Sequence, residues 1–199
     1  MCGRYFIDFE TEKAICELLQ QMDRDMRAER LGLRSTDVVP SDTAPILVDA
    51  GGHLEVERQR WGFPGVGGKG LVINARAETV LEKKMFHDAV ISRRAVVPAS
   101  RFYEWNKNRD RITFLREDRE VLFMAGFYSR FEDGNHYVIL TTKANDSMAC
   151  THDRMPLLLE KDAVEDWVFN GSRLKEYLLK EPAPLAKEAE YEQISLPGL

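Results

Sequence analysis

The sequence predicts an α+β fold in which helices flank a strongly curved antiparallel β-sheet or barrel. Strand-like segments dominate residues 37–142. The turns between these segments are short, and short turns favour antiparallel pairing. The chain has 199 residues, of which 44% are hydrophobic and 31% charged, as is typical of a soluble globular protein. We therefore expect a single domain over residues 1–199, with a sizeable core.

Four helices are expected, one of them in the middle of the chain. Residues 9–22 carry apolar side chains at helical spacing, and either Asp8 or Thr11 is suited to cap the first turn. A second helix is expected over residues 79–91, and two short amphipathic helices over 161–169 and 171–179. Residues 23–36 are charged and irregular. The acidic, Pro-containing tail over 181–199 either wraps the surface or stays mobile.

The expected strands lie between these helices. Residues 46–48 and 53–61 are expected to form a hairpin around Gly51 and Gly52, and residues 112–115 and 121–127 a second one. Further strands are predicted at 71–73, 95–98, 101–105, 136–142 and 157–159. The Gly-rich stretch 62–70 lacks the Gly-x-x-x-x-Gly-Lys-Ser/Thr pattern of a phosphate loop, so we interpret it as a flexible connection.

Composition excludes several classes of protein. No apolar run approaches the roughly 20 residues of a membrane span, and the N-terminus has no secretory signal. The three cysteines, Cys2, Cys16 and Cys150, are scattered and show no metal-ligand spacing. We therefore expect a cytoplasmic protein with no disulfide framework, no metal and no cofactor.

Positive charge is concentrated in the middle of an acidic chain. The formal net charge is −5, yet residues 58–109 hold eleven Lys and Arg against four Asp and Glu, a local balance of +7. Such a region is either a solvated basic face or a surface for nucleic acid.

Cys2 follows the initiator Met1 directly. Removal of Met1 would give Cys2 a free α-amine, with a pKa of about 7.7–8.0, beside a thiol with a pKa of about 8.5. Both groups would then be partly in their nucleophilic forms near neutral pH. The alternative interpretation is that Cys2 is a small hydrophobic residue without chemical function.

Three more residues have both a functional and a structural interpretation. Asn74 ends a predicted strand, where it could line a site or cap the following helix. Glu104 sits among aromatic residues, where burial would suit a general acid or base; alternatively it lies on the wet face of its strand with Tyr103 and Trp105 inward. His152 precedes a Pro-ended turn and is either a proton shuttle or a surface histidine.

Six short segments occur in an order that resembles the SOS response-associated peptidase (SRAP) family, which includes the abasic-site shield proteins. The segments are Met1-Cys2-Gly3-Arg4, Trp61-Gly62, Ile73 to Thr79, Val97-Pro98-Ala99, Phe102-Tyr103-Glu104-Trp105 and Thr151 to Pro156. The resemblance covers residues 1 to about 160. It implies a mixed α/β domain with antiparallel strands that binds single-stranded DNA at abasic sites, and nothing is carried over past about Leu159.

The resemblance also implies roles for individual residues. The active-site residues of the family match Cys2, Asn74, Glu104 and His152. Its phosphate-contacting arginines match Arg4, Arg76 and Arg154. Residues that wedge against DNA bases match Pro40, Trp61 and a residue near Lys83–Met85. The sequence departs from the family after Gly62, where a Gly-rich loop replaces a longer loop with a second Trp, and Ala95 replaces a common Cys.

These residue types suit the trapping of an aldehyde. An opened abasic sugar is an aldehyde, which the α-amine and thiol of a terminal Cys2 can bind together as a thiazolidine. Glu104 would deliver a proton to the ring oxygen, His152 would assist ring opening, and Asn74 would position the amine and sugar. Trp61 would stack on a base. The expected partner is single-stranded DNA with abasic sites, bound by a monomer that is associated with the nucleoid and not with a membrane.

Other activities remain open for the same residues. Cys2 could instead serve a thiol autopeptidase or N-terminal-nucleophile hydrolase, activated by His152 or by its own amine. The chain could also be a non-enzymatic module for single-stranded DNA. A β-elimination lyase acting through the same Schiff base would be a side activity of abasic-site binding.

Overall fold

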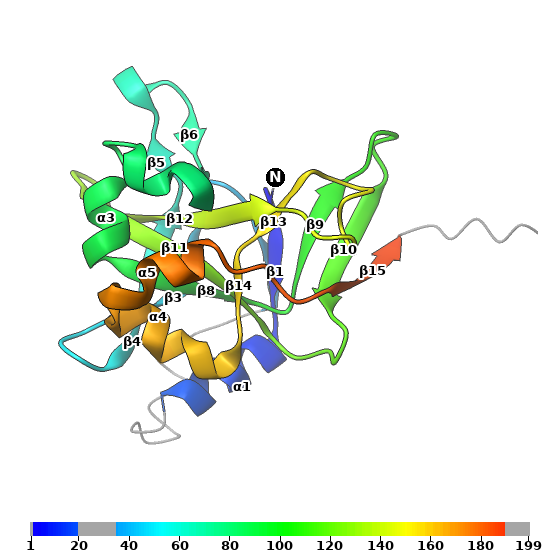
Figure 1. The fold of residues 1–199 in the computed structure, drawn as a ribbon, viewed down its shortest axis with the longest axis horizontal. Coiled ribbons are helices and arrows are strands. Elements are labelled where there is room, and N and C mark those ends of the chain that lie inside the picture. Colours follow the sequence, from blue (N-terminus) through cyan, green and yellow to red (C-terminus); the bar gives the residue numbers. More distant parts are fainter. Residues whose placement is uncertain (1, 20–34, 190–199) are drawn as a thin grey trace, which may run out of the picture.

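The computed structural model describes residues 2–19 and 35–189, which form a closed β-barrel next to a separate β-sheet (Figure 1). The barrel strands pair in the circular order β12-β4-β3-β8-β11, and β11 pairs with β12 to close it. Their bounds are Thr43–Asp49 for β3, Leu54–Trp61 for β4, Arg94–Ala99 for β8, Leu122–Phe131 for β11 and Gly134–Lys143 for β12. This barrel, with its flanking helices, confirms the predicted α+β class.

Three short strands attach to the barrel and carry several of the predicted site residues. They are β7 (Asn74–Arg76), β13 (Arg154–Pro156) and β14 (Leu158–Leu159). β12 pairs with β13 in antiparallel fashion but with β4 and β7 in parallel. Most barrel pairings are antiparallel as expected, and the two parallel ones join strands from distant segments, about which local turn length says nothing.

The second sheet is wholly antiparallel and follows the order β15-β10-β9-β1-β2. The bounds of its strands are Tyr5–Ile7 for β1, Thr36–Val38 for β2, Arg101–Trp105 for β9, Arg111–Arg116 for β10 and Leu185–Ala189 for β15. The hairpin expected between residues 112–115 and 121–127 is wrong, because β10 belongs to this sheet and β11 to the barrel. Each strand finds its partners elsewhere: β10 pairs with β9 and β15, and β11 with β8, β12 and β14.

The helices follow the predictions with one exception. α1 (Phe9–Leu18) begins at a capping box formed by Asp8 and Thr11, as expected. The final residues of the predicted helix, and most of the irregular stretch after it, lie outside the described residues. The two C-terminal helices are α4 (Val164–Phe169) and α5 (Leu174–Leu178), preceded by the short turns η3 (Lys161–Ala163) and η4 (Gly171–Arg173).

The exception is the helix expected over residues 79–91. It is divided into a 3-10 segment, η2 (Ala77–Glu82), and a short helix, α3 (His87–Ser92). Lys83 is extended at φ −89° and ψ 113°, which ends the first segment. Within the described ranges, no helix combines the length and the apolar character needed to cross a membrane.

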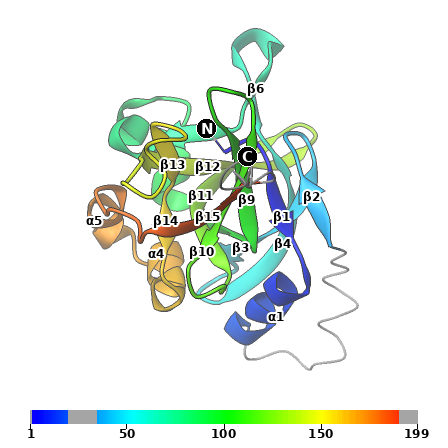
Figure 2. The same cartoon turned by 90° about the vertical axis from the view of Figure 1, so that its right-hand side faces the viewer.

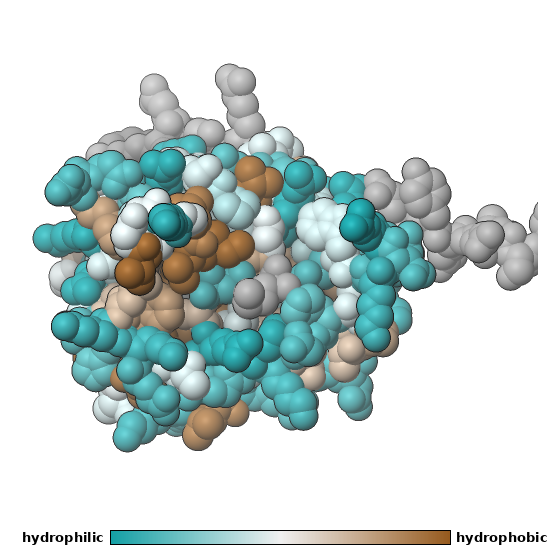
Figure 3. All heavy atoms as spheres, turned by 90° about the horizontal axis from the view of Figure 1, so that it is seen from above, coloured by the Kyte–Doolittle hydropathy of each residue, from teal (hydrophilic) through white to brown (hydrophobic). Residues whose placement is uncertain are grey.

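The Gly-rich stretch forms a small hairpin of β5 (Phe63–Pro64) and β6 (Leu71–Val72), joined through η1 (Val66–Gly68). Gly62 precedes it with φ +109°, a conformation that other residues rarely adopt. Val66 is 85% exposed and Leu71 42% exposed. Figure 3 shows apolar side chains gathered on this part of the surface.

The buried residues form two apolar clusters, and barrel strands contribute to both. On β3, Leu47 packs into the cluster shared with the helices, whereas Ile46 and Val48 pack into the cluster shared with the five-stranded sheet. Alternate residues of a strand point to opposite faces, so one strand serves both clusters. The second cluster includes Cys2 and Trp61 and therefore underlies the N-terminus.

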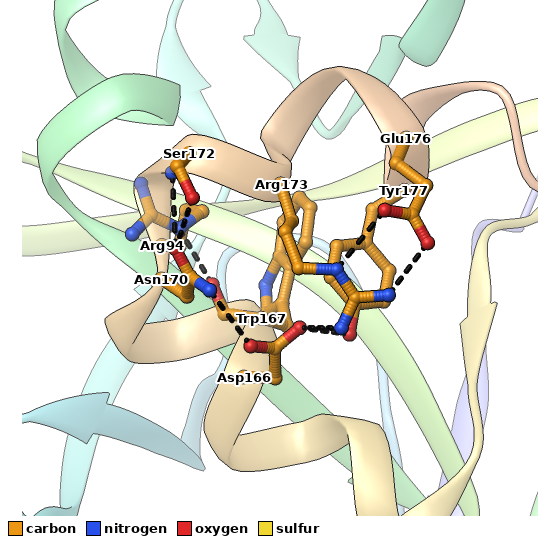
Figure 4. A network of polar contacts seen from close by, with 8 residues as sticks. All are labelled: Arg94, Asp166, Trp167, Asn170, Ser172, Arg173, Glu176 and Tyr177. Atoms are coloured by element: carbon orange, nitrogen blue, oxygen red, sulfur yellow. Dashed lines mark hydrogen bonds and ion pairs between the residues drawn. The ribbon is translucent and has the colours of Figure 1, made fainter.

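A buried arginine ties the helices to the barrel. The Arg94 guanidinium donates to the backbone oxygens of Val90 and Ile91 at the end of α3, and to those of Trp167 (2.6 Å) and Val168 (3.0 Å) in α4. Trp167 Nε1 in turn donates to the Ala95 oxygen at 2.9 Å. Figure 4 shows Arg94 and Trp167 next to the surface network around Asp166.

Candidate functional site

Cys2 lies ahead of β1 and is buried, with 1% of its surface exposed. The chain before Tyr5 continues along β9, since the Tyr103 N–H donates to the Arg4 oxygen at 3.0 Å. Burial, and after it the charge of Glu104, raises the pKa of the Cys2 thiol far above its usual value. The structure thus brings Cys2 into the electrostatic range of Glu104 and holds its sulfur as a neutral thiol.

Asn74 reaches Cys2 from the barrel. It is the first residue of β7, which lies parallel to β12 with Asn74 opposite Ile139. Its Nδ2 donates to the Cys2 backbone oxygen at 2.9 Å. Its Oδ1 is buried and accepts no hydrogen bond from the described residues. The helix-cap interpretation is wrong, because no side chain caps η2 and Asn74 instead fixes the N-terminus.

Glu104 is buried on β9, with 4% of its surface exposed. Ile112 is its partner on β10. The next residue, Trp105, is 41% exposed. The interpretation that put Glu104 on the wet face and Trp105 inward is therefore wrong. The strand alternates as predicted, but the sequence pattern does not say which of its two faces meets the core.

Tyr5 and Tyr137 form a buried pair beside Cys2 that the sequence did not reveal. Their hydroxyl oxygens are 2.6 Å apart, and one donates to the other. Burial raises the pKa of both phenols, and the neighbouring Cys2 contributes in the same direction. Nothing in the local sequence signals this contact, since the two residues lie on different sheets and 132 positions apart.

Trp61 is fully buried, with 0% exposure, so the prediction that it stacks on a DNA base is wrong. Its ring is nearly parallel to that of Tyr137, at 7° and a centroid distance of 6.3 Å. Its Nε1 donates to the Ile73 oxygen at 3.0 Å, directly before Asn74. Trp61 is therefore part of the scaffold that positions β7.

His152 lies in the turn that leads into β13. Its backbone N–H donates to the Met148 oxygen at 3.1 Å, and 28% of its side chain is exposed. The ring Nδ1 lies 3.0 Å from the Arg154 backbone nitrogen and 2.9 Å from the Asp153 carboxylate. A neutral ring can accept from Arg154 at Nδ1, whereas a protonated ring donates to Asp153. One strand, β12, lies between β13 and the strand that begins at Asn74, because β12 pairs with both β13 and β7.

Two of the predicted phosphate contacts meet around Thr141. Arg76 lies opposite Thr141 across the β7–β12 pairing and is exposed. Arg154 donates to the Thr141 oxygen and forms a bidentate ion pair with Glu78, at 2.7 and 2.8 Å. This pair lowers the pKa of Glu78. Arg76 thus presents its charge to solvent, while Arg154 already has a carboxylate partner.

The third predicted arginine and the predicted wedge lie around the N-terminus. The Arg4 guanidinium is 3.7 Å from Asp37 and sits over the Trp105 ring at 6.0 Å. Pro40 is half-buried in the turn before β3, which backbone hydrogen bonds tie to Trp61. Met85 is 39% exposed in the segment between η2 and α3. Both Pro40 and Met85 are therefore partly accessible.

The arrangement combines a nucleophile, a carboxyl group and an amide around one chain terminus. Cys2 is joined to Asn74 by a hydrogen bond and to Glu104 by electrostatic interaction. Glu104 can hold or move a proton, and Asn74 can orient the backbone. Both lie next to Cys2, which carries a thiol and gains a free α-amine if Met1 is removed.

Comparisons with known proteins agree with this arrangement. The model of the family described as SOS response associated peptidase matches residues 1–196. The abasic site processing protein YoaM of Bacillus subtilis is 29% identical over 195 residues, which covers 89% of this chain and 83% of the relative. The abasic site processing protein YedK of Escherichia coli is 28% identical over 176 residues, covering 84% of this chain and 79% of the relative.

Solved structures share the fold. A protein from Bordetella bronchiseptica superposes with a TM-score of 0.75 at 21% identity, covering 94% of this chain and 99% of that one. A protein from Bacteroides thetaiotaomicron gives 0.77 at 20% identity, covering 96% and 93%. With the family model matching nearly the whole sequence, the chain belongs to the SOS response associated peptidase (SRAP) family.

Proposed function

We propose that this protein processes abasic sites in single-stranded DNA by bonding covalently to the opened sugar through Cys2, once Met1 has been removed. The observation that carries the proposal is the buried contact of Cys2 with Asn74 and its proximity to Glu104. The names of the relatives, abasic site processing proteins, support the choice of lesion.

The bonds of the reaction balance with the loss of one water. The α-amine of Cys2 attacks C1′ of the opened aldehyde, and the carbonyl oxygen leaves as water, which gives an imine. The thiol then adds across the C=N bond, so that sulfur bonds to C1′ and the nitrogen gains a proton. The product is a five-membered thiazolidine between the protein terminus and the DNA.

Burial of the thiol supports this order of steps. The raised pKa of Cys2 keeps the sulfur protonated near neutral pH, so the amine attacks first. Addition of sulfur to the imine then requires a group that takes the thiol proton. Glu104 is the carboxylate whose charge acts on this thiol, and we assign it that role together with proton delivery to the sugar ring oxygen.

Asn74 and His152 complete the proposed machinery. The Asn74 amide fixes the Cys2 carbonyl through Nδ2, and its buried Oδ1 is suited to accept a hydrogen bond from the Cys2 amine or from a sugar hydroxyl. His152 lies on the turn before β13 and would assist ring opening. Its ring has two proton states with different partners, Arg154 and Asp153.

The DNA would be held by charge and by exposed rings. Arg4 and Arg76 would contact phosphates, which positions a strand without reading its sequence. Arg154 would act alongside them, with its ion pair to Glu78 as its resting partner. Trp105, rather than the buried Trp61, offers a ring for stacking at the site. Pro40 and Met85 are accessible apolar contacts for the bases.

The direct test is denaturant-resistant crosslinking to single-stranded DNA with one abasic site. Wild-type protein should form a DNA adduct, and Cys2→Ala should form none. Cys150→Ala removes an exposed thiol and is the matched control, which should react like the wild type. Equal yields from wild type and Cys2→Ala would refute the proposal.

The description of the family as a peptidase supports a second candidate, a thiol autopeptidase in which Cys2 releases its own preceding residue. A thiolate nucleophile is needed for this reaction, and the raised pKa of Cys2 opposes it. Mass spectrometry of the N-terminus separates the two. Retention of Met1 in Glu104→Gln or His152→Ala, but not in wild type, would favour self-cleavage; loss of Met1 in all three assigns that step to another enzyme.

A further inference from the structure

We propose that the outer face of the five-stranded sheet is a track for single-stranded DNA that extends the site beyond the lesion. We call this surface the arginine–aromatic face; it consists of Arg4, Phe6, Arg101, Tyr103, Trp105 and Arg111. The inference takes its ligand, single-stranded DNA, from the proposed function. The chemistry of Cys2 plays no part in the binding of DNA to this face.

Strand register puts these side chains on one face. Phe6 pairs with Arg101 and Tyr103 with Thr113, while Trp105 pairs with Arg111. Directly paired residues of an antiparallel sheet share a face, and their strand neighbours point the other way. Those neighbours, Tyr5, Phe102, Ile112 and Phe114, are buried in the second apolar cluster. The opposite set therefore forms the outer face, which Figure 2 views with β1, β9, β10 and β15 toward the reader.

Each arginine of the face lies over an aromatic ring. Arg101 is 3.9 Å from the centroid of Phe6, Arg111 is 5.0 Å from that of Tyr103, and Arg4 is 6.0 Å from that of Trp105. Trp105 is exposed and Phe6 partly exposed, whereas Tyr103 is buried at 5% exposure and supports Arg111, so the face presents three planar cations and two accessible rings. Single-stranded nucleic acid is bound by this combination, because bases stack on rings and on guanidinium planes while the charges attract phosphates.

The charge of the face suits a polyanion. Its carboxylates, Asp37 and Glu188, each face an arginine: Asp37 lies 3.7 Å from Arg4, and Glu188 lies 2.6 Å from Arg119. The turn after β9 adds exposed Lys107, Arg109 and Asp110, which contribute a net charge of +1 at the edge. The arginine–aromatic face therefore carries a net positive charge, although the net charge of the chain is −5.

The face is continuous with the proposed site through two strands. β9 points Glu104 into the core and Trp105 outward, and the chain before β1 buries Cys2 while Arg4 reaches the face. A strand whose lesion sugar lies at Cys2 would meet Arg4 and Trp105 next. It could then follow the guanidiniums of Arg111 and Arg101 and the partly exposed ring of Phe6 along the sheet, with the buried Tyr103 supporting both arginines from below.

The test is the binding of undamaged single-stranded DNA, measured by fluorescence anisotropy with a 20-nucleotide thymidine strand over a range of salt concentrations. The double variant Arg101→Gln/Arg111→Gln should bind about tenfold more weakly at low salt. The slope of log K against log salt should fall by about 1.4, at roughly 0.7 for each lost phosphate contact on a single strand.

The control removes the same charge elsewhere. Arg58→Gln/Arg130→Gln alters two exposed arginines on β4 and β11 of the barrel and should leave the affinity within about twofold. Thermal unfolding verifies that the variants are folded. Should the double variant misfold, Phe6→Leu provides a milder probe, which removes one ring, retains the charges, and should weaken binding with an unchanged salt slope.

Three results would overturn the inference. One is equal loss of affinity in the two double variants, which would mean that only net charge matters. Another is equal affinity for a duplex of the same length, since stacking needs unpaired bases. The third is equally effective competition by polyglutamate, which would make the face a surface for acidic protein. Wild-type crosslinking to a five-nucleotide abasic strand separately reports on Cys2, so the two proposals can fail independently.

Discussion

At the scale of single residues, Asn74 fixes the position of the terminus that we propose to be reactive. Its amide donates to the Cys2 carbonyl, and that carbonyl is adjacent to both the amine and the thiol. An N-terminus with no such anchor would be free to move, and two bonds to one sugar carbon require defined geometry. Cys2 itself is held by burial, which also keeps its sulfur protonated.

Replacement of Asn74 should slow the reaction without unfolding the protein. Asn74→Ala leaves the Cys2 carbonyl without its donor, and such a loss costs about 1–3 kcal/mol, or roughly a 5- to 150-fold lower single-turnover crosslinking rate. Rates are measured with saturating abasic strand, and urea unfolding verifies the fold. A crosslinking rate equal to that of wild type would contradict the proposed positioning role of Asn74.

Part of the site could be predicted residue by residue. Cys2, Asn74 and Glu104 were singled out through the family resemblance of short motifs, and the structure brings the three residues together. The role of Trp61 as a scaffold residue was not predicted, since its burial depends on Tyr5 and Tyr137 from other strands. Trp105 was misplaced because a period of two separates the faces of a strand without saying which one is wet.

At the scale of elements, Arg94 joins two short helices to the barrel. Neither α3 nor α4 is long enough to be stable alone, and the last carbonyls of each need donors. One buried guanidinium supplies donors to both. Residues 83–86 connect η2 to α3, so the segment after Asn74 is tied to the barrel through a residue far from the site.

Arg94→Lys should destabilise the fold by about 2–3 kcal/mol. The ammonium cannot reach carbonyls on both helices with a planar fork, so at least one buried acceptor loses its donor. Urea unfolding measures the change. The control Arg58→Lys alters an exposed residue of β4 and should shift the free energy of unfolding by less than about 0.5 kcal/mol. Similar values for the two variants would contradict the capping role.

Element boundaries were predicted well where the signal is local and poorly elsewhere. The helix start near Asp8 and the hairpin around Gly51-Gly52 were both predicted, and the structure confirms them. The division of the 79–91 helix at Lys83 was missed, since apolar spacing continues across it. The separation of β10 from β11 depends on partners such as β15, over 60 residues away in the chain.

At the scale of the whole molecule, the barrel and the sheet meet at a core that contains unusual titratable groups. Cys2, Tyr5 and Tyr137 lie together in this core, and burial raises the pKa of all three. The fold class was predictable because strand and helix patterns add up over the whole chain. The sequence left a curved sheet and a closed barrel as alternatives, because closure depends on the pairing of β12 with both β4 and β11, two strands that are distant from one another in the chain.

Stability should fall as pH rises above about 8.5. An unfolded thiol titrates near 8.5 and an unfolded phenol near 10, whereas the native groups keep their protons to higher pH. The unfolded state then binds fewer protons than the native state, so each such group lowers stability by about 1.4 kcal/mol per pH unit. Cys2→Ala should flatten this decline between pH 8.5 and 10 in urea unfolding, while Cys150→Ala should not. Parallel curves for Cys2→Ala and wild type would contradict the burial of a neutral thiol.

The central claim is that the terminal residue forms both bonds to the lesion, and the mass of the adduct tests it most directly. Intact mass spectrometry of protein incubated with abasic single-stranded DNA should give the mass of the chain without Met1, plus the DNA, minus one water. Borohydride should not be needed to preserve this species, because a thiazolidine is already closed, and peptide mapping should place the DNA on Cys2. An adduct that survives only after reduction, or that maps to a lysine or to Cys150, would contradict the account.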